Sequence, residues 1–194
     1  MAVEEQDLPV VANASRDAFA VWMDAQHARS RGIWLRIAKD ASGVATVTYA
    51  EALDVALCHG RIDGQKAGLD DAARLQRFTP RTARSRWSRV NRARATELIE
   101  LGLMRPAGQR PVDAAKADGR WDAAYAGQRT AVVPDYLRAA LDADPEASAF
   151  LATLDSRNRY AALYRIGDAK RPETRARRVA AFVAMMRDHR REYP

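Results

Sequence analysis

The sequence predicts an α+β protein: a small antiparallel sheet with helices in the N-terminal part, followed by a C-terminal all-helical module. Three observations support this prediction. Apolar residues alternate with other residues from Gly32 to Lys39, which is typical of a strand. Apolar residues at helical spacing flank that strand, and from Pro134 onward every segment has helical spacing. A chain of 194 residues, 47% of them hydrophobic, suits one mid-sized domain or a domain plus a subdomain.

The first elements follow a tail over residues 1–14. Ser15 can cap a helix, because its hydroxyl can accept a hydrogen bond from an unpaired backbone N–H of the first turn. The apolar residues between Phe19 and Met23 then face the core. After the strand over 32–39 comes a turn, and residues 44–47 are expected to return as an antiparallel partner strand.

Two helices and one more strand complete the N-terminal part. Thr48 and Glu51 form a capping box, which predicts a helix that stops near Gly60. A second strand is expected over 74–79, before Pro80. A longer helix is expected from Arg86 to Leu101, ending at Gly102.

The remaining chain is expected to be a linker and a helical module. The domain boundaries predicted are an α+β domain over 15–104, a linker with a short helix over 105–133 and a helical module over 134–194. Residues 105–111 (RPAGQRP) contain so much proline and glycine that no regular structure is expected there. In the module, Asp144 before Pro145 is a cap signal, Ser156 is expected to cap the next helix, and Pro172 begins the last one.

Composition limits the classes of function. The net charge is +7, but the chain has 28 arginines and only 4 lysines, a bias that a GC-rich genome also produces. A single cysteine, Cys58, excludes an intrachain disulfide, and the three histidines have no metal-ligand spacing, so no metal is expected. No secretory signal and no apolar run long enough to cross a membrane is found. A cytoplasmic protein without a cofactor is therefore expected.

One basic segment is not explained by composition alone. Residues 74–94 contain eight arginines and no acidic residue, and they lead into the start of the predicted helix, where free N–H groups favour anions. The hypothesis is a pocket for a small anionic ligand, such as a phosphate or a carboxylate. Its expected residues are Asp63, Arg81, Ser85, Trp87, Ser88 and Asn91.

Two alternatives stay open for this segment. Asp63, Asn91 and Arg94 can instead form a structural polar network that ties the sheet to the helix. The segment can also bind nucleic acid through phosphate contacts. The residues expected to do so are Arg74, Arg77, Arg84, Arg86, Arg89 and Arg92.

The sequence favours binding over catalysis. It has no GxSxG, no GxxxxGK[ST] and no GxGxxG after a strand, so hydrolase, P-loop and dinucleotide-binding classes have no support. Cys58 and His59 are adjacent and therefore about 100° apart on a helix, which is poor geometry for a thiolate and its base. Glu97 and Glu100 share a helix face, where such a pair is usually solvated. No catalytic residue is predicted.

Four segments resemble a known family in their order and spacing. They are YAEALDVALCHGRIDG (49–64), FTPRTARSRWSRVN (78–91), AAKADGRWDAAY (114–125) and AKRPETRARRV (169–179). The chain resembles, between about Phe19 and Arg187, the bacterial YdeI/OmpD-associated family, also called bacteriocin-protection proteins. The family pattern has aromatic residues where this chain has His59 and Arg61.

The resemblance implies a role in resistance to bacteriocins and antimicrobial peptides or in envelope stress, exerted through a protein partner or an anionic ligand. It implies no established enzymatic activity. In the N-terminal part, the positions that match the family's polar pattern are those of the expected anion pocket, together with Pro80. In the C-terminal module they are Lys170, Glu173, Thr174 and Arg175.

Overall fold

The computed structural model describes residues 8–127, 131–167, 169 and 171–193 and divides into two compact units, one up to Ala124 and one from Tyr125. The elements of the first unit are β1 (Val10–Ala12), α1 (Arg16–Gln26), β2 (Ile33–Ala38), η2 (Asp40–Ser42), α2 (Tyr49–Cys58), β3 (Arg61–Gly68), β4 (Ala73–Pro80), α3 (Arg89–Glu100) and α4 (Pro106–Ala117). Those of the second are α5 (Asp135–Asp142), α6 (Pro145–Thr153), α7 (Ser156–Gly167) and α8 (Pro172–Arg187).

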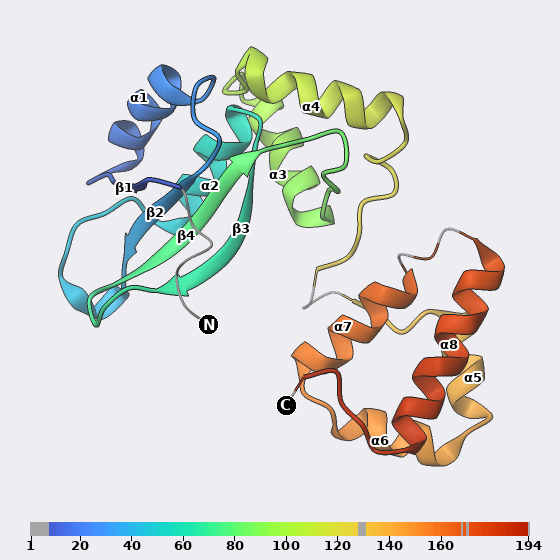
Figure 1. Cartoon of the computed structure of the whole chain (residues 1–194). Helices are drawn as coiled ribbons and strands as arrows, with labels where there is room; N and C mark the ends of the chain where they lie inside the picture. Colours follow the sequence, from blue (N-terminus) through green and yellow to red (C-terminus); the bar gives the residue numbers. More distant parts are fainter. Residues whose placement is uncertain (1–7, 128–130, 168, 170, 194) are drawn as a thin grey trace. The chain divides into compact units, whose positions relative to one another are not determined.

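The first unit is built on a four-stranded sheet of order β1-β2-β4-β3 (Figure 1). Strand β4 pairs antiparallel with both β2 and β3, as expected of a small antiparallel sheet. Strand β1 is parallel to β2, so the sheet is mixed; this short strand lies where the sequence predicted only a tail. The predicted α+β class, with an all-helical C-terminal part, is confirmed.

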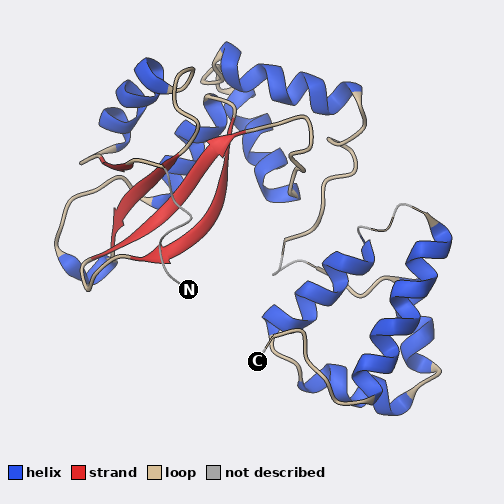
Figure 2. Ribbon diagram, viewed as in Figure 1, coloured by secondary structure: helices blue, strands red, loops and turns tan. Residues whose placement is uncertain are grey.

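Helices cover one face of this sheet. Figure 1 and Figure 2 show α2 behind the strands and α3 beside β3. Ile33 and Leu35 of β2 and Phe78 of β4 belong to the same buried core as residues of α1, α2, α3 and α4. The predicted caps form: the Ser15 hydroxyl accepts from Ala18 N at 3.2 Å, and Thr48 and Glu51 make the capping box. These residues fix where α1 and α2 begin.

The prediction of a strand over 44–47 is wrong. Both edges of β2 are already occupied, by β1 and β4, so no edge is left for a further partner. Val47 is buried instead, and its N–H donates to Asn13 O at 3.0 Å. The Thr46 hydroxyl accepts from Ala38 N at 2.9 Å. The segment is a loop, and its Val47 side chain belongs to the core.

The helix after the basic segment starts later than expected. Ser88 is the N-cap of α3 and its hydroxyl accepts from Asn91 N at 3.1 Å, so residues 86–88 precede the helix. Gly102 ends it with a φ of 68°, a left-handed conformation that glycine adopts without steric cost.

The prediction of irregular structure over 105–111 is also wrong. Helix α4 begins at Pro106, where a proline suits the first turn, and continues through Pro111. Val112 and Ala115 are fully buried in the core of the first unit. Their burial offsets the one backbone hydrogen bond that Pro111 cannot make.

In its described residues, the second unit is a bundle of the helices α5 to α8 with its own core. Asp144 caps α6 as predicted, accepting from Ala147 N at 3.1 Å. Ser156, the expected cap of α7, is the first residue of that helix, and the Asp155 side chain accepts from Asn158 N at 2.7 Å. The core joins all four helices through residues that include Leu137, Leu151, Leu163 and Phe182. Among the described residues of the whole chain, no helix is long and apolar enough to cross a membrane.

Candidate functional site

Asp63 and Asn91 meet, and they do so in a closed polar cluster. Asn91 Nδ2 donates to Asp63 Oδ1 at 3.2 Å, and the Tyr49 hydroxyl donates to Asp63 Oδ2 at 2.8 Å. The cluster therefore joins β3 to α2 and α3. Burial raises the pKa of Tyr49 well above its usual range, and the neighbouring Asp63 carboxylate raises it further. Both carboxylate oxygens of Asp63 are thus engaged within the protein.

Arg94 does not belong to this cluster. It donates from Nε and Nη2 to the two oxygens of Asp54, at 2.6 and 2.5 Å, and its Nη1 lies 2.5 Å from Glu97. These hydrogen bonds raise the pKa of Arg94. Of the structural network expected from Asp63, Asn91 and Arg94, the Asp63–Asn91 contact forms and the contact to Arg94 does not.

Arg81 lies with Trp87, apart from Asp63. The Arg81 guanidinium carbon is 3.6 Å from the ring centroid of Trp87, and Nη1 donates to Arg86 O at 3.1 Å. Trp87 is 2% exposed and packs edge-on against Trp121, with ring centroids 4.8 Å apart. A cation over an indole face is a favourable contact that holds the guanidinium in one position.

The two serines of the expected pocket shape the backbone. Ser85 Oγ accepts from Thr82 N at 2.9 Å, and Ser88 caps α3. The six residues of the hypothesis thus separate into the Asp63–Asn91 pair, the Arg81–Trp87 pair and two serines that hold turns.

Arg81 lines a basic cavity of about 450 Å³ in the first unit. The other five residues of the hypothesis do not line it. Its wall comes from the segment after β4, from α4 and the turn that follows it, and from the ends of α1 and α2. The charged residues in the lining are Arg81, Arg110, Arg120 and Asp118; His27 and His59 also line it. We call this the Arg81 cavity.

The arginines of the Arg81 cavity differ in their contacts. Arg120 is held in place, because Nη2 pairs with Asp118 Oδ2 at 2.8 Å and Nη1 donates to Ser85 O at 2.9 Å. Arg110 is exposed on α4 and has no hydrogen-bond or ion-pair partner among the residues that the structure describes. The cavity therefore offers an unoccupied guanidinium beside two that are positioned.

The wall next to the cavity is held by residues where the chain departs from the family pattern. Arg61 is 1% exposed, and Nη2 donates to His27 O at 2.9 Å and to Ser30 O at 2.8 Å. Burial lowers the pKa of Arg61. His59 is buried with Nε2 2.9 Å from Asp24 Oδ1, and its Nδ1 contacts Val55 O at 2.7 Å. Arg61 and His59 thus connect α1, α2 and β3.

The arginines of the nucleic-acid alternative do not share one surface. Arg74 and Arg77 lie three residues apart in regular strand β4, so their side chains are on opposite faces of the sheet. Arg74 lies over the Tyr49 ring at 5.8 Å, and Arg92 donates to Trp121 O at 3.1 Å. Arg84 and Arg89 are exposed, whereas Arg86 is half-buried.

Cys58 and the described metal-ligand residue types show no arrangement typical of a reactive thiol or a metal site. Burial raises the pKa of the Cys58 thiol, which keeps it protonated and unreactive. Among the described residues, no group of three or more His, Cys, Asp or Glu side chains is arranged to hold a metal ion.

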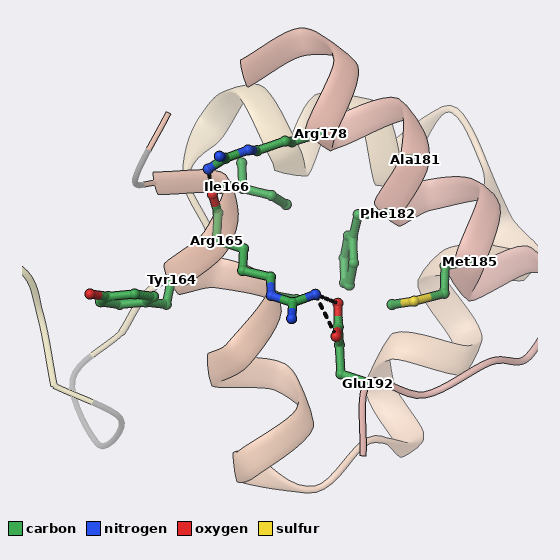
Figure 3. A pocket seen from close by; sticks show the side chains of 9 residues that line it. Tyr164, Arg165, Ile166, Arg178, Ala181, Phe182, Met185 and Glu192 are labelled. Carbon is green, nitrogen blue, oxygen red and sulfur yellow. Dashed lines mark hydrogen bonds and ion pairs between the residues drawn. The ribbon is translucent and has the colours of Figure 1, made fainter. Parts of the chain in front are cut away.

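The second unit contains a cavity of about 450 Å³ between α7 and α8 (Figure 3). Its interior is lined by Ile166, Phe182 and Met185. Arg165 Nη1 donates to both oxygens of Glu192, each at 2.7 Å, and this ion pair forms part of the wall. We call this the Arg165 cavity.

A larger groove of about 710 Å³ lies between α5 and α8. Its floor is mostly alanine and valine. Arg175 lies at one end, 5.3 Å from the ring centroid of Tyr136, and its Nη2 donates to Ala169 O at 3.0 Å. Of the other positions matched to the family, Glu173 is exposed and Thr174 half-buried in the first turns of α8, and Lys170 lies outside the described residues.

Sequence reasoning missed the cavity residues Arg110, Arg120, Arg165 and Glu192. For Arg110 a signal existed, since a proline at the first position of a helix is common and Pro106 could have marked the start of α4. For the other three, the contacts of Arg120 with Ser85 O and of Arg165 with Glu192 join residues 27 or more positions apart, and no local pattern indicates these two contacts.

Comparisons with known proteins give a family for each part of the chain. Residues 11–111 match the model of a domain of unknown function (DUF8412), and residues 130–189 match the model described as bacteriocin-protection, YdeI or OmpD-associated. Four segments of the sequence resemble the YdeI/OmpD-associated family. Of these, 169–179 lies within the match to that family's model, whereas 49–64 and 78–91 lie within the match to the DUF8412 model. No curated protein and no solved structure matches significantly.

Since the first match covers more than half of the chain and the second most of the remainder, the protein belongs to the DUF8412 family and carries a C-terminal domain of the bacteriocin-protection, YdeI or OmpD-associated family.

Proposed function

We propose that the protein is a non-enzymatic binding protein that takes a small anionic ligand in the Arg81 cavity, in a role of the kind the name of its C-terminal family indicates, protection against bacteriocins or envelope stress. The observation that carries this proposal is Arg110, which lines the cavity without a partner among the described residues. An exposed guanidinium next to positioned arginines suits a phosphate or carboxylate group, which accepts hydrogen bonds from planar N–H donors.

The charges of the cavity support an anion over a neutral ligand. Asp118 is the acidic residue among the described lining residues, and it pairs with Arg120. Arg81 and Arg110 thus leave an excess of positive charge. The volume of about 450 Å³ is within the range of small-molecule pockets, roughly 300–1,000 Å³.

Titration calorimetry and thermal unfolding with inorganic phosphate and with citrate as probes test the proposal. We expect Arg110→Gln to weaken binding of the better probe by about tenfold or more, because a charge-assisted hydrogen bond contributes roughly 1.5–3 kcal/mol. The matched control is Arg84→Gln, an exposed arginine of residues 74–94 that does not line the cavity, which should leave the affinity unchanged.

No saturable binding of either probe, or an equal loss from both substitutions, would overturn the proposal. A DNA duplex is the probe that tests the alternative of nucleic-acid binding. Binding to it that falls steeply with salt and is weakened more by Arg84→Gln than by Arg110→Gln would favour a nucleic-acid function.

A further inference from the structure

The Arg165 cavity combines an apolar interior with two lining arginines, Arg165 and Arg178. Figure 3 shows Phe182, Met185 and Ile166 around the hollow and the Arg165 side chain extended across one side to reach Glu192, whereas the Tyr164 ring points away from this pair. Such a lining, mostly apolar with a few placed polar groups, is typical of small-molecule sites.

Glu192 accepts hydrogen bonds from only one nitrogen of the Arg165 guanidinium group. Both of its carboxylate oxygens accept from the same nitrogen, Nη1, and the Arg165 side chain is 64% exposed. Arg165 Nε and Nη2 donate to no group among the described residues. A carboxylate that lies along the fork of a guanidinium engages two nitrogens, which is the stronger geometry.

The backbone that carries Glu192 is anchored independently of this ion pair. Tyr193 N donates to Asn158 Oδ1 at 2.8 Å, and the Arg157 guanidinium carbon lies 4.3 Å from the Tyr193 ring centroid. A rotation of the Glu192 side chain can therefore release Arg165 without moving the segment that passes over α7.

We propose that the Arg165 cavity binds a small apolar carboxylate, whose carboxylate pairs with Arg165 and whose apolar part packs on Ile166, Phe182 and Met185. In the structure, the Glu192 carboxylate occupies the place of the ligand's carboxylate. The exchange of one carboxylate for another leaves Arg165 paired while the Glu192 carboxylate turns to solvent, and burial of the ligand's apolar surface then supplies the gain. This site lies in the second unit and does not depend on the Arg81 cavity.

The test uses the full chain with 4-phenylbutyrate as the probe and 4-phenylbutanol as its uncharged match, followed by calorimetry and by the methyl NMR signals of Met185 and Ile166. We expect the acid to bind at least about tenfold more tightly than the alcohol, since only the acid pairs with Arg165. Saturable shifts of the two methyl signals should accompany binding.

Variants separate the roles of the ion pair. Arg165→Gln should abolish the preference for the acid, and Glu192→Gln should strengthen acid binding several-fold because it removes the competing carboxylate. Arg190→Gln is the control: this exposed arginine pairs with Asp188 and does not line the cavity. Thermal unfolding of each variant verifies that it is folded.

Three results would overturn the proposal: no saturable binding of the acid to the wild type, equal affinity for acid and alcohol, or weaker acid binding in folded Glu192→Gln. The last result would make the Arg165–Glu192 pair a fixed part of the wall. None of these results bears on phosphate or citrate binding at the Arg81 cavity, so the two proposals fail separately.

Discussion

At the scale of single residues, the charged side chains of the first unit more often pair with other groups of the protein than stay free. Arg94 is held by Asp54, Arg120 by Asp118 and Arg61 by backbone carbonyls. A net charge of +7 therefore gives a poor guide to where an anion binds. Arg110 is more informative, because it lines a cavity and has no hydrogen-bond or ion-pair partner among the described residues.

The Asp24–His59 contact predicts a pH dependence of stability. The hydrogen bond to His59 lowers the pKa of Asp24 below its usual value near 3.8. A group with a lowered folded-state pKa stabilises the fold above its unfolded-state pKa, and this contribution is lost as the pH falls through the folded-state pKa. Because the Asp24 side chain is 50% exposed, the contribution is at most about 1 kcal/mol.

Urea denaturation of Asp24→Asn and wild type at pH 7 and pH 2.5 measures this effect. We expect the variant to be less stable than the wild type at pH 7 and this deficit to be smaller at pH 2.5. Asp71→Asn, at an exposed position with no hydrogen-bond or ion-pair partner among the described residues, should show no difference at either pH. A deficit of Asp24→Asn that persists undiminished at pH 2.5 would assign the effect to packing and not to charge.

At the scale of elements, the seating of α4 against the end of α2 decides the shape of the Arg81 cavity. Gly108 is buried at this contact, where an added Cβ would lie 2.6 Å from Leu57 O and closer still to Cys58 O. Gly60, with a φ of 71°, meets the same helix, since an added Cβ would collide with Ala107 O. Glycine at these positions lets α4 approach the turn between α2 and β3.

Gly108→Ala is therefore expected to destabilise the protein. Alanine gains up to about 1 kcal/mol over glycine in a helix. Overpacking against two backbone carbonyls costs more, typically 1–3 kcal/mol and occasionally higher. The net loss, about 1–2 kcal/mol, is measurable by urea denaturation.

Gly68→Ala is the control for this substitution, because an added Cβ there meets nothing within 4 Å. It should change the free energy of unfolding by less than about 1 kcal/mol. A Gly108→Ala variant as stable as the wild type would show that α4 does not sit against α2 as described.

At the scale of the whole molecule, the first unit ends at Ala124, after α4. The boundary at 104 expected from the sequence would remove α4 and with it Val112 and Ala115, which are fully buried in the core. We expect a fragment of residues 1–124 to unfold cooperatively in urea and to give dispersed amide NMR signals. A fragment of residues 1–104 should give neither, since removal of that surface exposes the core of the unit.

A fragment of residues 125–194 serves as the matching measurement on the second unit, which has a core of its own and should also fold. Equal stability of fragments 1–104 and 1–124 would contradict the assignment of α4 to the core. It would instead favour the linker over 105–133.

Local signals determined most of the elements by themselves. The capping box at Thr48 and Glu51, the cap at Ser15 and the alternation around Ile33 depend on residues a few positions apart, and the structure has each of them. The basic segment, the family resemblance and the α+β class also followed from the sequence. The caps and the alternation depend on neighbouring residues, so the sequence alone is enough to predict them.

The tertiary structure decided what those residues do. It brought Asn91 to Asp63 and placed Arg81 on Trp87, it formed α4 where proline and glycine suggested a loop, and it gave β2 its neighbours. Each of these outcomes depends on which residues far apart in the chain compete for the same partner or the same buried space. The local spacing of residues does not predict the outcome of that competition. The Arg81 and Arg165 cavities could therefore be identified only from the tertiary structure.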